Sequence, residues 1–307
     1  HSPSRRQRQM CIRDSALYIE SRLDSYEGPG LKSIDSNSFM TASKLFLLFK
    51  EERSSVIKPL AVDSQEGTGS MGDDTALAVM SKMHRQIYDF FRQQFAQVTN
   101  PPIDSLREVA VMTLETCFGP ELNIYEESPE HAKRLVTTSP VLSHRKLQSI
   151  LSNPYFKAHE INLSFEKNIS LKKAIINLQN KVVDVVDSGI AIIHLVEDLP
   201  DEGKLNINAL LAVGAVHQKL VKLGKRSDAN IIVTSYSARD THQIACLIGF
   251  GATAVYPSLA YQTILDLTNR NELKGDPHEN CFRYRKGVNK GLLKTVSYTH
   301  LTLPTTR

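Results

Sequence analysis

The 307-residue sequence contains no tryptophan, few cysteines and no long apolar run. Its four cysteines, Cys11, Cys117, Cys246 and Cys281, are widely scattered and form no C-x-x-C pair. This spacing suits neither a zinc site nor an iron–sulfur cluster, and it argues against a disulfide framework. We therefore expect reduced thiols and a cytoplasmic protein, with Cys117 and Cys246 buried as small apolar residues in helices.

A membrane segment is also missing from the sequence. The longest apolar stretch, residues 190–196, is interrupted by His194 and is far shorter than the roughly 20 residues that cross a bilayer. The basic start, which holds Arg5, Arg6 and Arg8, is not followed by the apolar region of a secretory signal. The sequence therefore predicts no membrane partner.

Excess positive charge is confined to the two ends of the chain. The formal net charge is +4, and the four Arg and one Asp of residues 1–15 together with Arg307 account for all of it. The remaining body is neutral, whereas a nucleic-acid-binding protein carries a basic excess, so we predict no nucleic-acid partner. Residues 1–15 and 295–307 lack periodicity and resemble translated sequencing-adaptor sequence. We expect them to be non-native tails, with ordinary termini as the alternative.

Residues 16–160 predict a mainly helical and irregular region. Apolar residues recur at helical spacing over residues 87–98, and two prolines follow that stretch. A capping-box pattern then predicts a second helix over residues 105–117. The polar residues 126–163, which include three prolines, predict an extended connection to the second half of the chain.

Residues 161–280 predict parallel βα units. Apolar strands are expected at residues 190–196, 229–234 and 252–256, separated by amphipathic helices. Those helices are expected at residues 170–188, 208–223, 240–248 and 259–267, with Ser170 and Ser258 as N-caps and Gly189 as a C-terminal glycine. Three strands are too few for a closed eight-stranded barrel. The predicted fold class is therefore α/β, with parallel βα units forming an open sheet or incomplete barrel after a mainly helical segment.

One glycine-rich stretch, residues 67–72, matches the G-x-G-x-x-G pattern of dinucleotide-binding proteins. Its context differs from that of a nucleotide site, because polar residues rather than an apolar strand precede it. Asp73 and Asp74 follow directly, where two carboxylates would repel a pyrophosphate. We interpret the stretch as a turn before a helix capped by Asp74, and a free-standing flavin- or nucleotide-binding module is the alternative.

Ser237, Asp240 and His242 include the residue types of a hydrolase triad. They lie too close together on one turn to form a catalytic relay, and the chain contains no G-x-S-x-G motif. We expect Asp240 to cap a helix. Arg239 is expected to be exposed at the C-terminal end of a strand, where α/β sheets place ligands, so it is a candidate for contact with an anion or a partner.

The ten histidines form no H-x-x-x-H or H-E-x-x-H pattern, and a metal site has little support. His194 lies in an apolar strand, and His217 lies on an apolar helix face. Both are expected to be core histidines with satisfied hydrogen bonds. The residues therefore predict an α/β domain with no self-evident active site, as in a scaffold within a larger assembly.

Several strings in this sequence are similar to the large chain of glutamate synthase. The most specific is IYDFFRQQFAQVTNPPIDSLRE, and the others are GSMGDDTALAVMS, SDANIIV with SARDTHQIACLIGFGATAVYPSLAYQT, and YRKGVNKGLLK, at residues 87–108, 69–81, 227–263 and 284–294. They occur in the order of the family, and the resemblance spans about residues 40–294. The chain thus resembles the central domain of that family over residues 16–280, followed at 281–294 by the start of an FMN-binding barrel.

The resemblance implies the reaction of the family, in which glutamine, 2-oxoglutarate and two electrons yield two glutamates. An amidotransferase domain with an N-terminal cysteine would release ammonia, and an internal tunnel would carry it to the FMN domain. Electrons would pass through FMN and an iron–sulfur cluster, from ferredoxin or from NADPH by a small subunit. The central domain would join the two catalytic domains and help to wall the tunnel.

No catalytic, cofactor-binding or metal-binding residue is carried over to this sequence. The amidotransferase cysteine, the FMN pocket and the cluster cysteines have no counterpart in residues 16–294. Polar turns are instead the candidates for interdomain or tunnel-side contacts. These candidates are Gly69, Ser70, Asp73, Asp74, Thr75, Thr99, Asn100, Pro101 and Arg239. A non-catalytic interaction domain with exposed apolar surface is a third interpretation.

Overall fold

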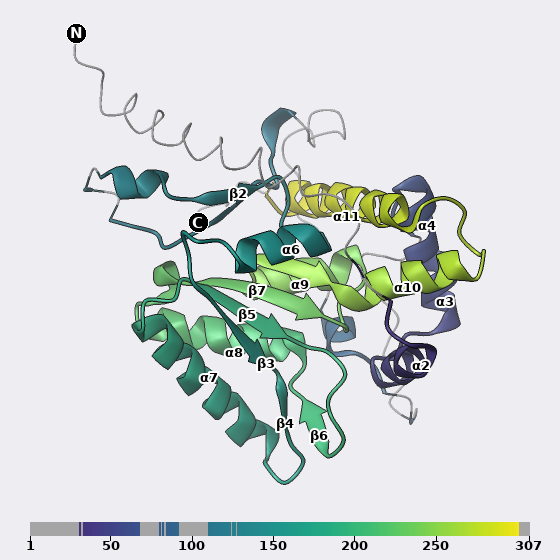
Figure 1. Cartoon of the computed structure of the whole chain (residues 1–307), viewed down its shortest axis with the longest axis horizontal. Coiled ribbons are helices and arrows are strands. Elements are labelled where there is room, and N and C mark those ends of the chain that lie inside the picture. Colours follow the sequence, from purple (N-terminus) through teal and green to yellow (C-terminus); the bar gives the residue numbers. More distant parts are fainter. Residues whose placement is uncertain are drawn as a thin grey trace. The chain divides into compact units, whose positions relative to one another are not determined.

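The computed structural model describes residues 31, 33–67, 80, 82, 84–91, 110–123, 125–126 and 128–300. The chain forms two compact units, and Figure 1 shows their elements. Unit 1 comprises His1–Leu31, Glu115–Ser235 and Phe250–Tyr256, and unit 2 comprises Lys32–Leu114, Tyr236–Gly249 and Pro257–Arg307.

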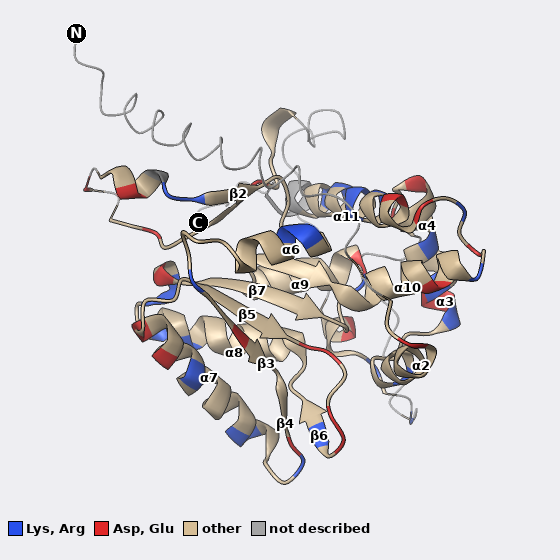
Figure 2. Ribbon diagram, in the orientation of Figure 1, with Lys and Arg blue, Asp and Glu red and all other residues tan. Residues whose placement is uncertain are grey.

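Unit 1 is built on a four-stranded sheet. Its strands are β3 (Ala158–Asn162), β5 (Ile192–Val196), β7 (Asn230–Ser235) and β8 (Ala254–Pro257), in the order β3-β5-β7-β8. The first two pairings are parallel, and a parallel bridge from Val141 to Val255 extends the sheet beyond β8. Every residue of β5 and β7 is buried, which explains their nearly continuous apolar sequences. Figure 2 shows both strands free of acidic and basic residues.

Two long helices of unit 1, α7 (Leu171–Asp187) and α8 (Ala209–Lys222), pack against each other, and α8 packs on β7 (Figure 1). As predicted, the Ser170 hydroxyl accepts a hydrogen bond from the Lys173 amide and caps α7. Gly189 ends that helix with a φ of +82°, a conformation that disfavours residues with a side chain. The sequence thus places both ends of α7 correctly.

The smaller elements of unit 1 form two antiparallel pairs and short helices. They are β1 (Thr116–Phe118) with β2 (Leu135–Thr137), β4 (Ser164–Glu166) with β6 (Lys204–Asn206), α6 (His144–Leu151), and the 3-10 helices η3 (Pro129–Ala132) and η4 (Arg226–Asp228).

Unit 2 is helical in the residues that the structure describes. Its elements are α2 (Ser36–Leu45), α3 (Lys50–Glu52), the π-helix η1 (Arg53–Ile57), α4 (Lys58–Asp63), the 3-10 helix η2 (Ile87–Phe90), α9 (Thr241–Gly249), α10 (Ser258–Asn269) and α11 (Pro277–His300). The α4 helix packs along α11. A Cβ on Gly287 would lie 2.7 Å from Leu60 Cδ2. The glycine in RKGVN therefore permits close helix packing.

The α/β class and the parallel strands are confirmed, but one strand of the four-stranded sheet, β3, and the short strands of the two antiparallel pairs were missed. Residues 126–163 were predicted as an extended connection, and they contain β2, α6 and β3. The sequence of β3, AHEIN, has one fully buried residue, Ile161, because β3 lies at the edge of the sheet. A polar edge strand lacks the apolar run that identifies a central strand.

Two helix predictions in the first half need correction. The helix expected over residues 87–98 is a 3-10 turn at 87–90 followed by extended backbone at Phe91, and the rest of that stretch lies outside the described residues. The helix expected over 105–117 does not reach Cys117, which is exposed in β1. Pairing with β2 overrides the local helical pattern there. Cys246, by contrast, is half-buried in α9.

Within the part of the chain that the structure describes, every helix is too short or too polar to cross a lipid bilayer.

Candidate functional site

The C-terminal edge of the unit 1 sheet is the position where α/β folds commonly hold ligands. Glu197 directly follows β5 and is 1% exposed. Its carboxylate accepts a hydrogen bond from the Ser235 hydroxyl at 2.7 Å and another from the Ala209 amide at 2.9 Å. Ala209 is the first residue of α8, so the Glu197 carboxylate occupies the N-terminus of that helix.

A helix N-terminus attracts anions because its first amide groups have no partner within the helix. In this chain the Glu197 carboxylate supplies the negative charge, and the amide of Glu197 also donates to the Thr234 carbonyl at 2.9 Å. A phosphate bound at α8 would have to displace this buried carboxylate. The arrangement therefore argues against a nucleotide at this end of the sheet.

Both histidines that the sequence assigned to the core have hydrogen-bond partners. His194 Nδ1 lies 3.1 Å from Glu160 Oε2, and its Nε2 lies 2.7 Å from Thr234 Oγ1. Burial lowers the pKa of His194, although the neighbouring Glu160 carboxylate opposes that shift. His217 is half-buried, and its Nδ1 accepts a hydrogen bond from Arg226 Nε at 3.0 Å. Burial and then Arg226 lower the pKa of His217.

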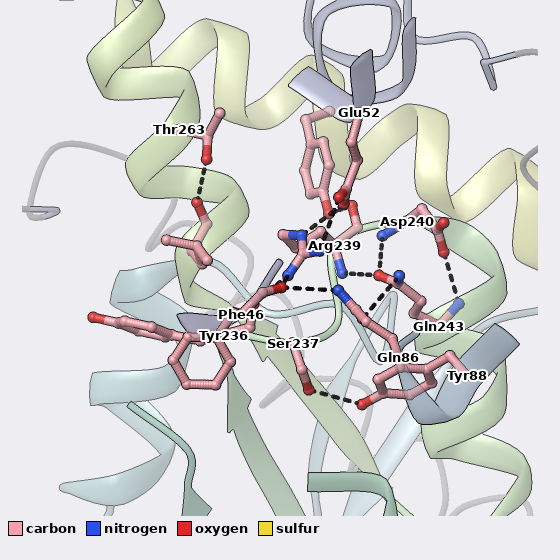
Figure 3. A network of polar contacts seen from close by, with 12 residues as sticks. Phe46, Glu52, Gln86, Tyr88, Tyr236, Ser237, Arg239, Asp240, Gln243 and Thr263 are labelled. Atoms are coloured by element: carbon pink, nitrogen blue, oxygen red, sulfur yellow. Dashed lines mark hydrogen bonds and ion pairs between the residues drawn. The ribbon is translucent and has the colours of Figure 1, made fainter. Parts of the chain in front are cut away.

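Arg239 lies at the centre of a polar network in unit 2 (Figure 3). Its Nε and Nη2 donate to the two carboxylate oxygens of Glu52 at 2.6 and 2.8 Å. Its Nη1 donates to the carbonyls of Tyr236 and Phe46 at 2.9 and 3.1 Å. Burial opposes the charge of Arg239, but the Glu52 carboxylate, with smaller contributions from Asp240 and Tyr88, raises the pKa overall.

The expected exposure of Arg239 is therefore wrong, because its side chain is 0% exposed. The sequence gives no sign of this burial, since Glu52 lies 187 positions away along the chain. Glu52 is one of the network residues that sequence reasoning missed. Its side chain is 18% exposed, and its carboxylate matches the guanidinium in a two-bond geometry, which is the arrangement typical of buried arginine.

The residues of the rejected hydrolase triad each have a structural partner. Asp240 Oδ1 accepts a hydrogen bond from the Gln243 amide at 2.7 Å, which confirms Asp240 as a helix cap. Ser237 Oγ lies 3.1 Å from the Tyr88 hydroxyl, and His242 Nε2 lies 3.1 Å from the Tyr88 carbonyl. Burial raises the pKa of Asp240 to about 6.

Two further hydrogen bonds complete the network, and Figure 3 shows the first of them, between Gln86 and Phe46. The Gln86 amide group donates to the Phe46 carbonyl at 2.9 Å, and the Tyr284 hydroxyl donates to the Arg239 carbonyl at 2.7 Å. The network thus ties together segments from residues 46–52, 86–90, 236–243 and 284. Its groups are largely satisfied by one another, which is typical of a structural core rather than an open reaction centre.

One cap prediction is wrong. Ser258 is the first residue of α10, Pro257 holds the N-cap position, and that cap makes no side-chain hydrogen bond. Pro257 has φ −79° and lacks an N–H group, so it suits a helix start without a capping hydroxyl.

The remaining site candidates lie outside the described residues. They are Gly69, Ser70, Asp73, Asp74, Thr75, Thr99, Asn100 and Pro101. Gly67, which is described, has a packing role, because a Cβ there would lie 2.2 Å from the Ser55 carbonyl oxygen. Among the described residues, no three His, Cys, Asp or Glu side chains come together to hold a metal ion.

The fold and these contacts define an α/β domain whose ligand edge is filled by its own side chains. Sequence comparison identifies the family, since residues 41–300 match the glutamate synthase central domain. The chain is 36% identical over 286 residues to ferredoxin-dependent glutamate synthase 2, chloroplastic, of Arabidopsis thaliana, covering 88% of this chain and 18% of the relative. It is 32% identical over 263 residues to the glutamate synthase [NADPH] large chain of Bacillus subtilis, covering 85% and 17%.

A third relative, glutamate synthase [NADH] of Saccharomyces cerevisiae, is 30% identical over 262 residues, covering 80% of this chain and 12% of the relative. The chain therefore belongs to the glutamate synthase family and corresponds to its central domain. It spans less than a fifth of the length of the curated relatives that it matches.

Proposed function

We propose that this chain is the linking domain of a glutamate synthase that converts glutamine, 2-oxoglutarate and two electrons into two glutamates. In this role it joins an amidotransferase domain to an FMN-binding domain and helps to wall the ammonia tunnel. The match to a central domain, over a small part of much longer relatives, supports the role of a connector.

The observation that carries this proposal is the position of the Glu197 carboxylate. It fills the helix N-terminus where a phosphate-bearing cofactor would bind, and the Ser235 hydroxyl and Ala209 amide hold it there. A domain that satisfies this edge with its own groups contributes packing surface rather than a reaction centre. We therefore assign the chemistry to neighbouring domains and not to this one.

The cofactors and partners follow from the same assignment. FMN and an iron–sulfur cluster would lie in other parts of the enzyme, and electrons would come from ferredoxin or from a small NADPH-oxidising subunit. The relatives include ferredoxin-dependent and NADPH-dependent enzymes, so the family membership is compatible with either donor. We propose a cytoplasmic location, although several relatives are chloroplastic.

The finer site and boundary assignments belong to this proposal. Gly69, Ser70, Asp73, Asp74, Thr75, Thr99, Asn100 and Pro101 remain our candidates for interdomain or tunnel-side contacts. Arg239 is no longer a candidate, because its side chain is buried against Glu52. The start of the FMN-binding domain, proposed at residues 281–294, lies within α11. Residues 1–15 and 295–307 remain proposed non-native tails.

Titration of the 307-residue chain with FMN tests the assignment against a free-standing flavin module. We expect no stoichiometric quenching of FMN fluorescence and no glutamate formation from glutamine, in a sample whose circular dichroism shows folded α/β structure. Stoichiometric binding of FMN or of a nucleotide by this folded chain would refute the linking role and favour the alternative.

A further inference from the structure

Arg226 joins three segments of unit 1 near the points where strands β7 and β8 begin. Its Nε donates to His217 Nδ1 of α8 at 3.0 Å. Its Nη1 donates to the Ala229 carbonyl at 2.6 Å, and its Nη2 donates to the Gly251 carbonyl at 2.9 Å. We call these three hydrogen bonds the Arg226 latch. The latch holds the turn at residues 250–253 to α8 and to the start of β7.

Two glycines allow the turn to lie close against α8. Gly251 has a φ of +114°, and a Cβ there would lie 2.3 Å from His217 Nδ1. A Cβ on Gly214, one turn before His217, would lie 3.0 Å from the Phe250 ring. A side chain at either position would push the turn away from the helix, so the closed arrangement depends on both glycines.

His217 can take part in the latch only as a neutral imidazole. A guanidinium donates hydrogen bonds and accepts none, so His217 Nδ1 must be unprotonated and the ring proton must lie on Nε2. Protonation of Nδ1 would place two N–H donors 3.0 Å apart, on two positively charged groups. Burial, and then the charge of Arg226, lower the pKa of His217.

The elements around His217 do not offset that repulsion. Helix α8 packs against α7, β7 and η4, and neither β7 nor the turn at residues 250–253 contains an acidic or basic side chain. The acidic residues of the other neighbouring segments are all exposed to solvent: Glu121 after β1, Asp184 and Asp187 in α7, and Asp228 in η4. Asp187 pairs with Lys225, and Glu121 acts on Arg226 by opposing the lowering of its pKa. Lys181 of α7 and Lys219 and Lys222 of α8 add positive charge.

We propose that the Arg226 latch is an acid-operated switch, in which protonation of His217 releases Arg226 and frees the turn at residues 250–253. Charged His217 removes one acceptor from Arg226 and repels it. Arg226 is half-buried, so its guanidinium can turn toward water, and the Ala229 and Gly251 carbonyls then lose their donor. The freed turn leaves α8, and Phe250, which is 37% exposed in the closed form, gains exposure.

The direction of the switch follows from the protonation of His217. The open form binds this proton more readily than the closed form, because the closed form lowers the pKa of His217. The closed form is therefore fully favoured above the ordinary histidine pKa of about 6.5, and it is lost as the pH falls through the lower pKa of the closed form.

Amide hydrogen exchange of the 307-residue chain at a series of pH values tests the switch. The Thr253 amide donates to the Ile231 carbonyl at 2.7 Å and reports on the turn. We expect its opening equilibrium, corrected for the intrinsic exchange rate, to rise by up to about tenfold per pH unit below about pH 6.5. His217→Asn should abolish this rise, because its amide oxygen accepts in place of Nδ1 and is not protonated. Arg226→Gln should raise the opening equilibrium at every pH.

His194→Gln is the matched control. His194 is another histidine of unit 1 whose pKa is lowered by burial, but its partners are Glu160 and Thr234. We expect this variant to keep the pH dependence of exchange at Thr253. The proposal is overturned if opening at Thr253 in the parent does not change with pH, if His217→Asn keeps the rise, or if His194→Gln abolishes it.

Nitrogen-15 NMR of the imidazole side chains tests the same switch without any substitution. We expect His217 to carry its proton on Nε2 at neutral pH and to titrate below the ordinary histidine pKa. A proton on Nδ1 at neutral pH, or a pKa at or above the ordinary value, would refute the switch, because Arg226 could not then hold His217 as a neutral acceptor.

Discussion

The two units bury polar groups in different ways. In unit 1 the sheet is apolar, and its buried polar side chains, such as His194 and Glu197, contact neighbouring strands or the helix that follows. In unit 2 a fully buried guanidinium, Arg239, depends on Glu52, a carboxylate from a distant part of the sequence. Unit 1 therefore relies mainly on non-directional apolar burial, and unit 2 relies on a specific ionic partner.

This difference has a consequence for single substitutions. Apolar burial is distributed over many residues, so most single changes remove a small part of it. A buried ion pair contributes little net stability when intact, but removal of one partner leaves an uncompensated charge in the interior. We therefore expect unit 2 to respond more sharply than unit 1 to a single change at its centre.

The largest effect is expected for Glu52→Ala. The substitution leaves Arg239 buried and charged without its two-bond partner, and we expect a loss of roughly 3–5 kcal/mol in the free energy of unfolding. Urea denaturation followed by circular dichroism measures this loss. Glu52→Gln keeps the shape and one acceptor and should lose less. A change below about 1 kcal/mol for Glu52→Ala would show that unit 2 does not depend on the pair.

The next prediction concerns pH and Asp240. Burial raises its folded-state pKa to about 6, above the unfolded value, so the folded state holds this proton more tightly. Protonated Asp240 therefore adds to the free energy of unfolding. This added stability is complete at pH values below the unfolded pKa, and it is lost as the pH rises through the folded pKa of about 6. A shift of this size corresponds to roughly 3 kcal/mol at most. Asp240→Asn should retain the cap and remove this pH dependence.

Unit 1 should respond to pH in the opposite direction. Burial lowers the pKa of His194, so the unfolded state binds its proton more readily and acid destabilises unit 1 below the ordinary histidine pKa. Unfolding measured at a series of pH values, with Asp240→Asn and His194→Gln as paired variants, separates the two slopes. If the free energy of unfolding changed equally with pH in the parent and in Asp240→Asn between about pH 4 and 6, the pH dependence could not be assigned to Asp240.

The features that could be predicted from the sequence are those that depend on a local pattern of residues. Strands β5 and β7 were predictable because each is a buried apolar run, and Ser170, Gly189 and Asp240 were predictable because caps act locally. The edge strand β3 was not predictable, since its own sequence is polar and it is stabilised by pairing with β5. The prediction of a buried, helical Cys117 was wrong for a related reason, because Cys117 lies in β1 and that strand pairs with β2.

The candidate site was less predictable than the fold. Asp240 was assigned correctly from its neighbours alone, whereas the burial of Arg239 depends on Glu52 from far along the chain. The role of Glu197 was equally hidden, because its contacts to Ser235 and Ala209 exist only after the sheet and α8 are assembled. Local patterns identify caps and strands, but they do not identify the partner of a buried charge.

Glu197→Ala tests the polar edge of unit 1. It leaves the Ser235 hydroxyl and the Ala209 amide without their acceptor, and we expect a loss of about 2 kcal/mol in the free energy of unfolding. Acetate or formate should restore part of that stability by binding in place of the carboxylate. The same salts added to the parent chain give the control, and rescue of equal size in both would argue against a carboxylate-specific site.

A smaller effect is expected at the glycines of unit 2. Gly287→Ala places a Cβ 2.7 Å from Leu60 Cδ2 and 3.1 Å from the Ser64 carbonyl carbon. We expect a loss of about 1–2 kcal/mol from overpacking, partly offset by the better helix propensity of alanine. Gly249→Ala is the matched control, because a Cβ there meets nothing within 4 Å and should be neutral or stabilising. Equal losses in both variants would exclude close packing as the cause.

The smallest effect is expected where an ion pair is exposed, and it sets the scale for the others. In unit 1, Lys133 Nζ lies 2.8 Å from Glu130 Oε2, and the two side chains are 55% and 57% exposed. Water solvates both charges after the pair is broken, so Glu130→Gln should change the free energy of unfolding by less than about 0.5 kcal/mol. The salt bridge of Arg239 and that of Lys133 contain the same kinds of charge, and burial distinguishes them. If Glu130→Gln cost as much as Glu52→Ala, burial would not explain the sensitivity of unit 2.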